Sequence, residues 1–326
     1  MCANAKSSIF GKFLKKKVAQ SNIGYHLLAL AVTAVWGTTF VSTKVLIVAG
    51  MHPAAIFAIR FLLSYVGICL ISLVRKDKVQ WFSRNWKDEL ICLFLGVSGG
   101  SIYFLIENSA LIYTQAANVS FFVCTAPLFT ALLTLIGRQV MKGRFRDGLE
   151  EVQLGRALIV GTLLALTGIA LVVFDGERLQ LSARGDILAI SAAILWAFYS
   201  LFAGEMTKEY NALFISRKVF FYGLITILPF LGNTASSFAP ELLSQPVIYL
   251  NLLFLGLVAS LIAFFSWHVV MAQIGNVTST NYIYLNPIFT LIVASLILSE
   301  QLSAQSLFGS LAILSGVILA GRSHKR

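Results

Sequence analysis

Long apolar stretches recur along the whole chain and leave little sequence between them. Ten of these stretches are about as long as the ~20 residues that a helix needs to cross a bilayer. They run approximately over 24–44, 53–74, 89–110, 117–137, 155–174, 186–204, 212–231, 247–271, 277–298 and 304–321. Charged residues are 12% of the sequence, whereas a soluble domain carries about 25%. The sequence therefore predicts an all-α polytopic membrane protein with ten transmembrane helices.

The basic residues fall mainly on one side when the chain is threaded through a membrane in this way. Of the 25 Lys and Arg residues, 21 lie near the termini or in and beside every second connection. The exceptions are Lys44, Arg60, Arg178 and Arg184. The positive-inside rule then predicts that both termini are cytoplasmic. Because this topology accounts for the net charge of +11, no nucleic-acid partner is expected.

Neither a metal nor a cofactor is expected from the sequence. The four cysteines show no CxxC spacing, so a metal site or a structural disulfide is not predicted. There is no GxxxxGK[ST] phosphate loop and no connection long enough for a nucleotide-binding domain, which argues against an ATP-driven pump. The basic segment 1–22 lacks the apolar core of a signal peptide, so we expect a cytoplasmic segment before a retained first helix.

The chain repeats itself at a constant offset of 160 residues. Residues 95–130 align without a gap on residues 255–290, and the same offset relates Trp36 to Trp196. Each half then contains five predicted helices. Because five is odd, the second half must enter the membrane in the opposite orientation, which is the inverted repeat found in many secondary transporters. We therefore predict two inverted five-helix repeats around a central cavity.

The predicted organisation places matched features in the two halves. Pro127 and Pro287 occupy equivalent positions inside apolar runs, where each is expected to kink its helix. The expected divisions are a basic cytoplasmic segment 1–22, a first repeat 23–174, an external connection 175–185, a second repeat 186–322 and a cytoplasmic tail 323–326.

The fifth helix of each half is expected to serve in packing. Gly161 and Gly168 recur as Gly309 and Gly316 at a shorter offset of 148, because the basic loop 138–154 is an insertion in the first half. Glycines at this spacing let two helices approach closely.

The sequence resembles the EamA-like branch of the drug/metabolite transporter superfamily over residues 24–322. The resemblance rests on AVWGTTFVSTKVL (34–46), HPAAIFAIRFLLSY (52–65), TAPLFTALL (125–133) and LNPIFTLIVASLILSEQLS (285–303). The last motif contains the helix-terminal acidic residue of the family at Glu300, whereas GRQVMKGRFRDG in the first half has no counterpart. The resemblance implies ten helices around a central cavity and transport of small organic solutes, often amino acids or other metabolites, out of the cell.

Ionisable residues inside the predicted spans are the first candidates for a solute site. Tyr103 and Glu107 share one face of the third helix, and a charge at mid-depth costs about 2.5–3.5 kcal/mol. Glu107 either binds a substrate amine or a coupling proton, or it forms a fixed ion pair with Arg60 or Lys44. Arg60 either grips a substrate carboxylate through its planar fork or braces the second helix.

Aromatic and small polar residues complete the candidate cavity. Aromatic residues there stack on flat or apolar solutes, or else they pack against helices and lipid. The polar residues bind solute or join helices, and His268 either shuttles protons or is a packed neutral histidine. These candidates are Trp36, Thr39, Asn118, Phe121, Thr125, Trp196, Tyr199, Tyr222, Trp267, His268, Asn281 and Tyr284.

The sequence thus predicts a secondary transporter, and not an enzyme, in a bacterial cytoplasmic membrane. We expect it to export a small metabolite, such as an amino acid or an amphipathic compound, by alternating access driven by a gradient or by exchange. The expected partners are the solute and the bilayer, with a coupling proton and a homodimer left open. A channel-like facilitator is one alternative. The other is an intramembrane serine protease using Ser98, in a Gly-x-Ser-Gly stretch, with His268 as its base.

Overall fold

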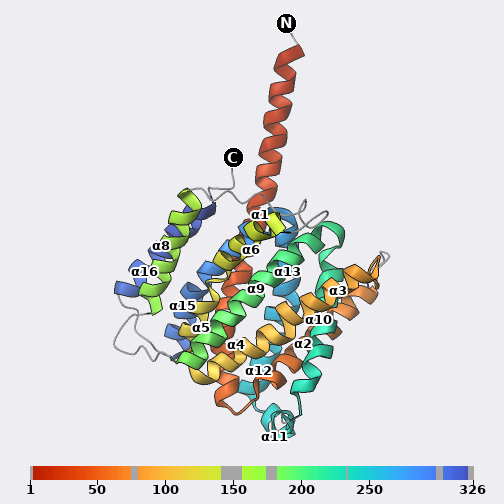
Figure 1. The fold of residues 1–326 in the computed structure, drawn as a ribbon, viewed down its shortest axis with the longest axis vertical. Coiled ribbons are helices and arrows are strands. Elements are labelled where there is room, and N and C mark those ends of the chain that lie inside the picture. The colour runs from red at the N-terminus through yellow and green to blue at the C-terminus, as the bar shows by residue number, and fades with distance from the viewer. Residues whose placement is uncertain are drawn as a thin grey trace.

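The computed structural model of the protein describes residues 3–74, 80–140, 156–173, 182–232, 234–298 and 304–321, with side chains from residue 23 onward apart from scattered helical positions. Every described element is helical (Figure 1). The first half contains α1 (Ala3–Val48), α2 (Pro53–Val74), α3 (Trp86–Gly96), the π-helical η1 (Val97–Ser101), α4 (Ile102–Tyr113), α5 (Ala116–Val123), α6 (Ala126–Val140) and α8 (Arg156–Val173).

The second half contains α9 (Ala183–Glu209), α10 (Ala212–Ile227), the short η2 (Leu228–Phe230), η3 (Ala235–Phe238) and α11 (Pro240–Leu243), then α12 (Pro246–Leu253), the π-helical η4 (Phe254–Ile262), α13 (Ala263–Ile274), α14 (Asn276–Thr280), η5 (Asn281–Leu285), α15 (Asn286–Leu298) and α16 (Ala304–Gly321).

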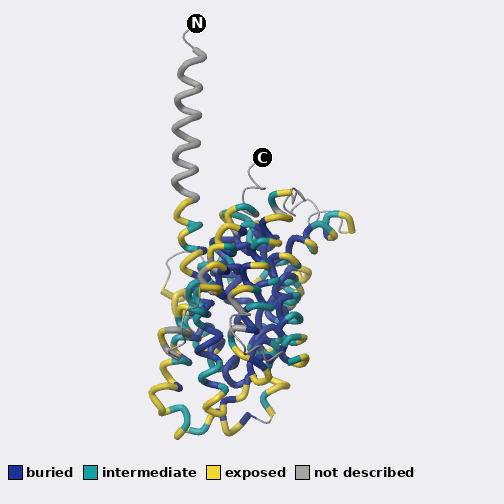
Figure 2. Tube along the Cα trace, turned by 90° about the vertical axis from the view of Figure 1, so that its left-hand side faces the viewer, coloured by how far each residue is buried: buried dark blue, intermediate teal, exposed yellow. Residues whose placement is uncertain are grey.

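Seven helices in the described part of the chain are long and apolar enough to cross a membrane. They are Ile23–Val48, Pro53–Val74, Trp86–Tyr113, Asn118–Val140, Ala183–Glu209, Ala212–Phe230 and Pro246–Ile274. Large apolar side chains such as Leu62 and Leu73 are exposed on their outer faces, as lipid contact requires. Buried residues gather in the interior of the bundle (Figure 2). The all-α membrane fold is therefore confirmed, and these helices correspond to seven of the ten predicted spans.

The first helices of the two halves run in opposite directions. The end of α1 lies beside the end of α4, because the Lys44 ammonium donates to the Thr114 carbonyl over 3.1 Å. The start of α9 packs on the same residue, since a Cβ on Gly185 would lie 2.8 Å from Cγ2 of Thr114. The end of α9 lies beside the segment that precedes α3, through an ion pair of 3.0 Å between Arg84 and Glu209. Hence α9 runs antiparallel to α3–α4, whereas α1 runs parallel to them.

The main helix contacts between the halves occur twice, once for each half. Helix α1 packs against α13 and α15, and its counterpart α9 packs against α4 and α6. Helix α2 packs against η4, and its counterpart α10 packs against η1 and α3. Helices α8 and α16 pack along each other at one side of the bundle (Figure 1). Each contact thus recurs with the two halves interchanged.

Glycines allow the close approach of α8 and α16. A Cβ on Gly168 would lie 2.6 Å from the carbonyl oxygen of Gly309, and a Cβ on Gly316 would lie 2.5 Å from that of Gly161. Real Cβ atoms do not occupy such positions, so only glycine fits at Gly168 and Gly316. The four glycines of the shorter repeat offset therefore form one helix–helix contact.

The two repeat-related prolines lie at helix starts. Pro127 is the second residue of α6, after a turn that separates α5 from α6. Pro287 is the second residue of α15, after the 3₁₀ segment η5. Proline is tolerated in a first helical turn because its missing N–H would have no intrahelical partner there. The first of these spans is thus divided into α5 and α6 and the second into α14, η5 and α15, and in each span the proline lies at the start of the last piece.

Candidate solute-binding cavity

A small cavity lies at the centre of the bundle, where both halves meet. Its volume is about 30 Å³, far below the ~300–1,000 Å³ of a typical small-molecule site. The protein is therefore closed around this cavity. The lining residues are Trp36, Thr39, Phe40, Arg60, Tyr103, Phe104, Glu107, Val123, Trp196, Phe264, Ile283 and Asn286.

One wall of the cavity is aromatic and is built from repeat-related residues. The rings of Trp36 and Trp196 meet edge to face with centroids 5.2 Å apart and an interplanar angle of 85°. Phe104 and Phe264, which are also related by the offset of 160, lie 6.3 Å apart. Residues that are exchanged by a twofold relation can touch only near its axis. The local pseudo-twofold axis therefore passes through the cavity.

Two residues of opposite charge, from α2 and α4, also line the cavity. The Arg60 guanidinium is 1% exposed, donates from Nε to Oγ of Ser260 over 2.9 Å, and lies 4.2 Å from the centroid of Phe104. The Glu107 carboxylate is 6% exposed and accepts a hydrogen bond of 2.9 Å from the Tyr103 hydroxyl. The charges of Arg60 and Glu107 attract each other.

The charges belong to one half only. The repeat-related position of Arg60 is Phe220, and that of Glu107 is Trp267, and both of these side chains are fully buried. The two halves therefore differ in charge at the cavity. Both contribute aromatic residues near the axis, but only the first half contributes the charged residues Arg60 and Glu107.

Polar atoms at the cavity still have hydrogen-bonding capacity. Among the described residues, neither Nε1 of Trp196 nor Oδ1 of Asn286 has a hydrogen-bond partner, although both atoms are buried. A buried polar atom without a partner costs about 1–3 kcal/mol. Such atoms on residues that line a cavity are those that a polar ligand or ordered water would satisfy.

Six of the fifteen residues predicted for solute binding line this cavity: Trp36, Thr39, Arg60, Tyr103, Glu107 and Trp196. Lys44, a predicted partner of Glu107, instead donates to the main-chain carbonyls of Leu111 and Thr114 over 2.5 and 3.1 Å. Trp267 lies directly behind the aromatic wall, with its ring centroid 4.9 Å from that of Trp36.

Tyr199 and His268 form a separate buried group. The Tyr199 hydroxyl lies 2.6 Å from Nε2 of His268, and Oγ of Ser216 lies 2.8 Å from Nδ1. Ser98, the nucleophile of the protease alternative, donates to the carbonyl of Phe94 over 2.8 Å. His268 is thus engaged by Tyr199 and Ser216, and the described contacts include no Ser98–His268 dyad.

The remaining predicted residues lie outside the cavity lining. Asn118 donates to the Thr114 hydroxyl over 3.0 Å, and Thr125 donates to the Phe122 carbonyl over 2.6 Å. Phe121 packs on Phe122 with ring centroids 4.9 Å apart. Asn281 and Tyr284 are buried, and the amide nitrogen of Asn281 and the hydroxyl of Tyr284 have no partner among the described atoms.

The six other lining residues lie outside the fifteen predicted ones: Phe40, Phe104, Val123, Phe264, Ile283 and Asn286. The signal for two of them was present in the sequence, because Phe104 and Phe264 match across the repeat. Glu300 and the predicted tail 323–326 lie outside the described residues, as do residues 175–181 of the predicted external connection 175–185.

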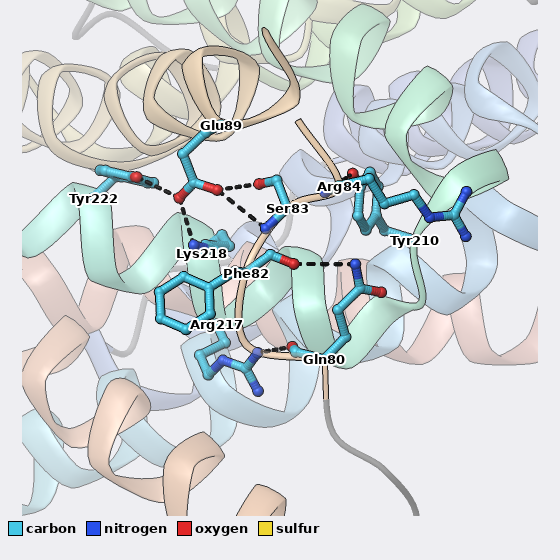
Figure 3. A network of polar contacts seen from close by, with 9 residues as sticks. All are labelled: Gln80, Phe82, Ser83, Arg84, Glu89, Tyr210, Arg217, Lys218 and Tyr222. Atoms are coloured by element: carbon cyan, nitrogen blue, oxygen red, sulfur yellow. Dashed lines mark hydrogen bonds and ion pairs between the residues drawn. The ribbon is translucent and has the colours of Figure 1, made fainter. Parts of the chain in front are cut away.

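Tyr222 belongs to a polar cluster at one end of the bundle (Figure 3). Glu89, in the first turn of α3, accepts hydrogen bonds from Ser83, from the Lys218 ammonium and from the Tyr222 hydroxyl, the last over 2.5 Å. The Arg217 guanidinium, which is 3% exposed, donates to the carbonyl of Gln80. These contacts tie the segment before α3 to α10.

Tyr210 extends this attachment to the end of α9. Its hydroxyl donates to Oδ2 of Asp88 over 2.6 Å and accepts from the main-chain N–H of Arg84 over 2.9 Å. Burial, with the hydrogen bond to Asp88, raises the pKa of Tyr210. The first half is therefore held to the second at this end of the bundle by charged groups and hydroxyls.

Comparisons with known proteins agree with this architecture. The profile of the EamA-like transporter family matches residues 23–140 and 183–322. A solved crystal structure superposes with a TM-score of 0.68 at 16% sequence identity, covering 91% of this chain and 98% of its own. At that identity the likeness concerns the fold alone.

Several curated relatives are transporters by name. A "Probable amino-acid metabolite efflux pump" of Salmonella typhimurium is 27% identical, over 90% of this chain and 93% of its own. An "Uncharacterized transporter" of Archaeoglobus fulgidus is 25% identical, over 90% and 96%. A "Probable terminal-alkyne amino-acid exporter" of Streptantibioticus cattleyicolor is 25% identical, over 72% and 74%. The chain belongs to the EamA-like transporter family and is an integral membrane transporter.

Proposed function

We propose that the protein exports an α-amino acid with an apolar side chain, or a close derivative that keeps both charges. The observation that carries this proposal is that Arg60 and Glu107 line the same cavity as several aromatic side chains. A guanidinium binds a carboxylate through paired N–H groups, and a carboxylate binds an ammonium. A zwitterion satisfies both charges at once, which an organic cation or anion alone does not.

The aromatic wall supports a solute with an apolar side chain. Trp36, Trp196 and Phe264 present rings to the cavity, and such rings bury apolar groups well. The printed names of two relatives, an amino-acid metabolite efflux pump and a terminal-alkyne amino-acid exporter, refer to solutes of this class.

The proposed mechanism is alternating access by the two inverted five-helix repeats, 23–174 and 186–322, in a bacterial cytoplasmic membrane with both termini cytoplasmic. In this proposal α8, α15 and α16 complete the ten spans. A cavity of about 30 Å³ is too small for leucine, so the present conformation is a closed one and the helices must separate to admit solute. Glu107 is the proposed site for a coupling proton, and exchange of solutes is the alternative source of energy.

The experiment is a thermal unfolding series on the purified protein with L-leucine, N-acetyl-L-leucine and L-leucine methyl ester. A ligand stabilises the native state by RT ln(1 + [L]/Kd). We expect leucine to raise the unfolding temperature more than either singly charged analogue, and the Arg60→Gln and Glu107→Gln variants to lose this difference. Stabilisation by the methyl ester alone would identify a cation transporter and contradict the proposal.

A further inference from the structure

A second pocket lies between α6, α9 and the end of α13, at the end of the bundle that holds the Glu89 cluster. Its volume is about 150 Å³, larger than that of the central cavity. It is lined by Thr134, Leu201, Gly204, Glu205, Lys208, Met271, Ala272, Gly275 and Asn276.

The residues of this pocket have repeat-related counterparts at the opposite end of the bundle. The offset of 160 relates Gly204 to Lys44, Met271 to Leu111 and Gly275 to Gln115. At the opposite end of the bundle, Lys44 occupies the position equivalent to Gly204, and its ammonium donates to the carbonyls of Leu111 and Thr114 over 2.5 and 3.1 Å. Those carbonyls end a helix, where the macrodipole favours a cation. The Lys44 ammonium therefore binds at the end of α4, which is the repeat-related counterpart of the end of α13.

The pocket beside the end of α13 has Gly204 at the position that is equivalent to Lys44. A Cβ on Gly204 would lie 2.9 Å from Cβ of Asn276, so this position cannot carry a long side chain without a shift of its neighbour. The adjacent Glu205 is 5% exposed and bonds to the Lys208 ammonium over 2.8 Å, and the Lys208 side chain is 49% exposed. Glu205, Lys208 and Asn276 make further interactions beyond these. The pocket thus offers a buried carboxylate, a helix end and an ammonium at its rim.

We propose that this pocket is a second site for the α-ammonium and α-carboxylate groups of an amino acid, with the ammonium at Glu205 and the end of α13 and the carboxylate at Lys208, so that the solute replaces the ion pair between Glu205 and Lys208. This inference rests on the proposed function, because it takes the same solute class. The pocket shares α9 and α13 with the central cavity. Glu205 lies nine residues beyond Trp196 on α9, which is about 14 Å of helix. The pocket is where a solute is held before it reaches the central cavity.

The test uses a cysteine at Ala272, an exposed lining residue, in the purified full-length protein. The reagents are 2-aminoethyl and 2-sulfonatoethyl methanethiosulfonate, and peptide mass spectrometry follows the modified residue. We expect the ratio of the cationic to the anionic rate at Ala272→Cys to exceed the ratio for free cysteine at least about tenfold, which is within the range of a single nearby charge; this excess is the cation preference. Millimolar L-leucine should slow the reaction, and N-acetyl-L-leucine should not.

The matched control is Ile112→Cys, which is exposed and is the repeat-related position near the end of α4, where the Lys44 ammonium binds. It should show neither cation preference nor protection by leucine. In Ala272→Cys, the added change Glu205→Gln should remove the cation preference. If that variant does not fold, Lys208→Gln replaces it, and this variant should keep the preference but lose protection by leucine.

A ratio of the two rates at Ala272→Cys equal to that for free cysteine, or protection by N-acetyl-L-leucine equal to that by leucine, would overturn this inference. Either result would leave the proposed function standing if leucine still raises the unfolding temperature through Arg60 and Glu107. Conversely, Glu107→Gln should reduce that thermal response to the part that the second pocket contributes and leave the cation preference at Ala272→Cys intact. The two proposals therefore fail in different measurements.

Discussion

Arg60 and Glu107 face the same central cavity from α2 and α4, yet in the described part of the chain they do not form an ion pair with each other. Instead, Arg60 is held by Ser260 and the ring of Phe104, and Glu107 is held by Tyr103. Each charge is thus positioned by neutral groups. Both side chains can therefore still bind a charged ligand.

Replacement of Glu107 by glutamine should impair transport while the protein remains folded. The amide is nearly isosteric and can still accept from Tyr103, but it cannot attract an ammonium. Hydrogen bonds to charged groups contribute about 1.5–3 kcal/mol, so leucine transport should fall about ten- to hundredfold. Arg60→Lys should also impair transport, because lysine lacks the paired N–H groups. Unchanged transport in Glu107→Gln at every pH would exclude Glu107 from solute binding and from coupling.

The aromatic wall should set the preference for the solute side chain. Trp196→Ala removes one ring of the pair that meets on the pseudo-twofold axis. We expect the apparent affinity for leucine to fall more than that for glycine, measured by competition with labelled leucine. Trp86→Ala is the control, because Trp86 is 68% exposed and lies outside the cavity. Equal losses for leucine and glycine would show that Trp196 has only a packing role.

The contact between α8 and α16 should not tolerate even one added methyl group. Gly316→Ala places a Cβ 2.5 Å from the Gly161 carbonyl oxygen, and overpacking costs about 1–3 kcal/mol. Gly24→Ala is the matched control, because nothing lies within 4 Å of the added Cβ. In thermal unfolding we expect only Gly316→Ala to be destabilised. Similar unfolding temperatures for both variants would contradict the packing described for these helices.

Tyr210 should stabilise the protein through its hydroxyl over the whole neutral range of pH. Its pKa is raised above the ordinary value near 10, so the folded state favours the protonated form. The contribution is complete below the unfolded pKa and is lost as pH rises through the folded pKa. Tyr210→Phe should therefore cost about 1 kcal/mol equally at pH 6 and pH 8. A cost that disappears between these two pH values would contradict the assigned hydrogen bonds to Asp88 and Arg84.

The sequence repeat predicted much of this architecture because an offset fixes equivalent positions without reference to side-chain packing. It related Trp36 to Trp196 and Gly161–Gly168 to Gly309–Gly316, and these residues do meet across the two halves. A kink was predicted at Pro127 and at Pro287, but each of these prolines is the second residue of a helix.

The face that each helix turns to the cavity was harder to predict. A membrane helix is apolar on its lipid face and on its packed face alike, so the usual amphipathic pattern is absent. Tyr222 was therefore expected in the cavity but bonds to Glu89 at one end of the bundle. The π-helical segments η1 and η4, which fall at repeat-related positions, also had no predictive signal, because no proline marks them. Such segments shift the register of the faces that follow.

The central claim is that one cavity containing Arg60 and Glu107 carries a zwitterionic amino acid between the two sides of the membrane. Counterflow in proteoliposomes tests it most directly: vesicles are loaded with unlabelled L-leucine and diluted into a trace of labelled L-leucine. We predict a saturable, transient accumulation of label that Arg60→Gln and Glu107→Gln both abolish. Label that only equilibrates without accumulating, or accumulation that both variants retain, would contradict the claim.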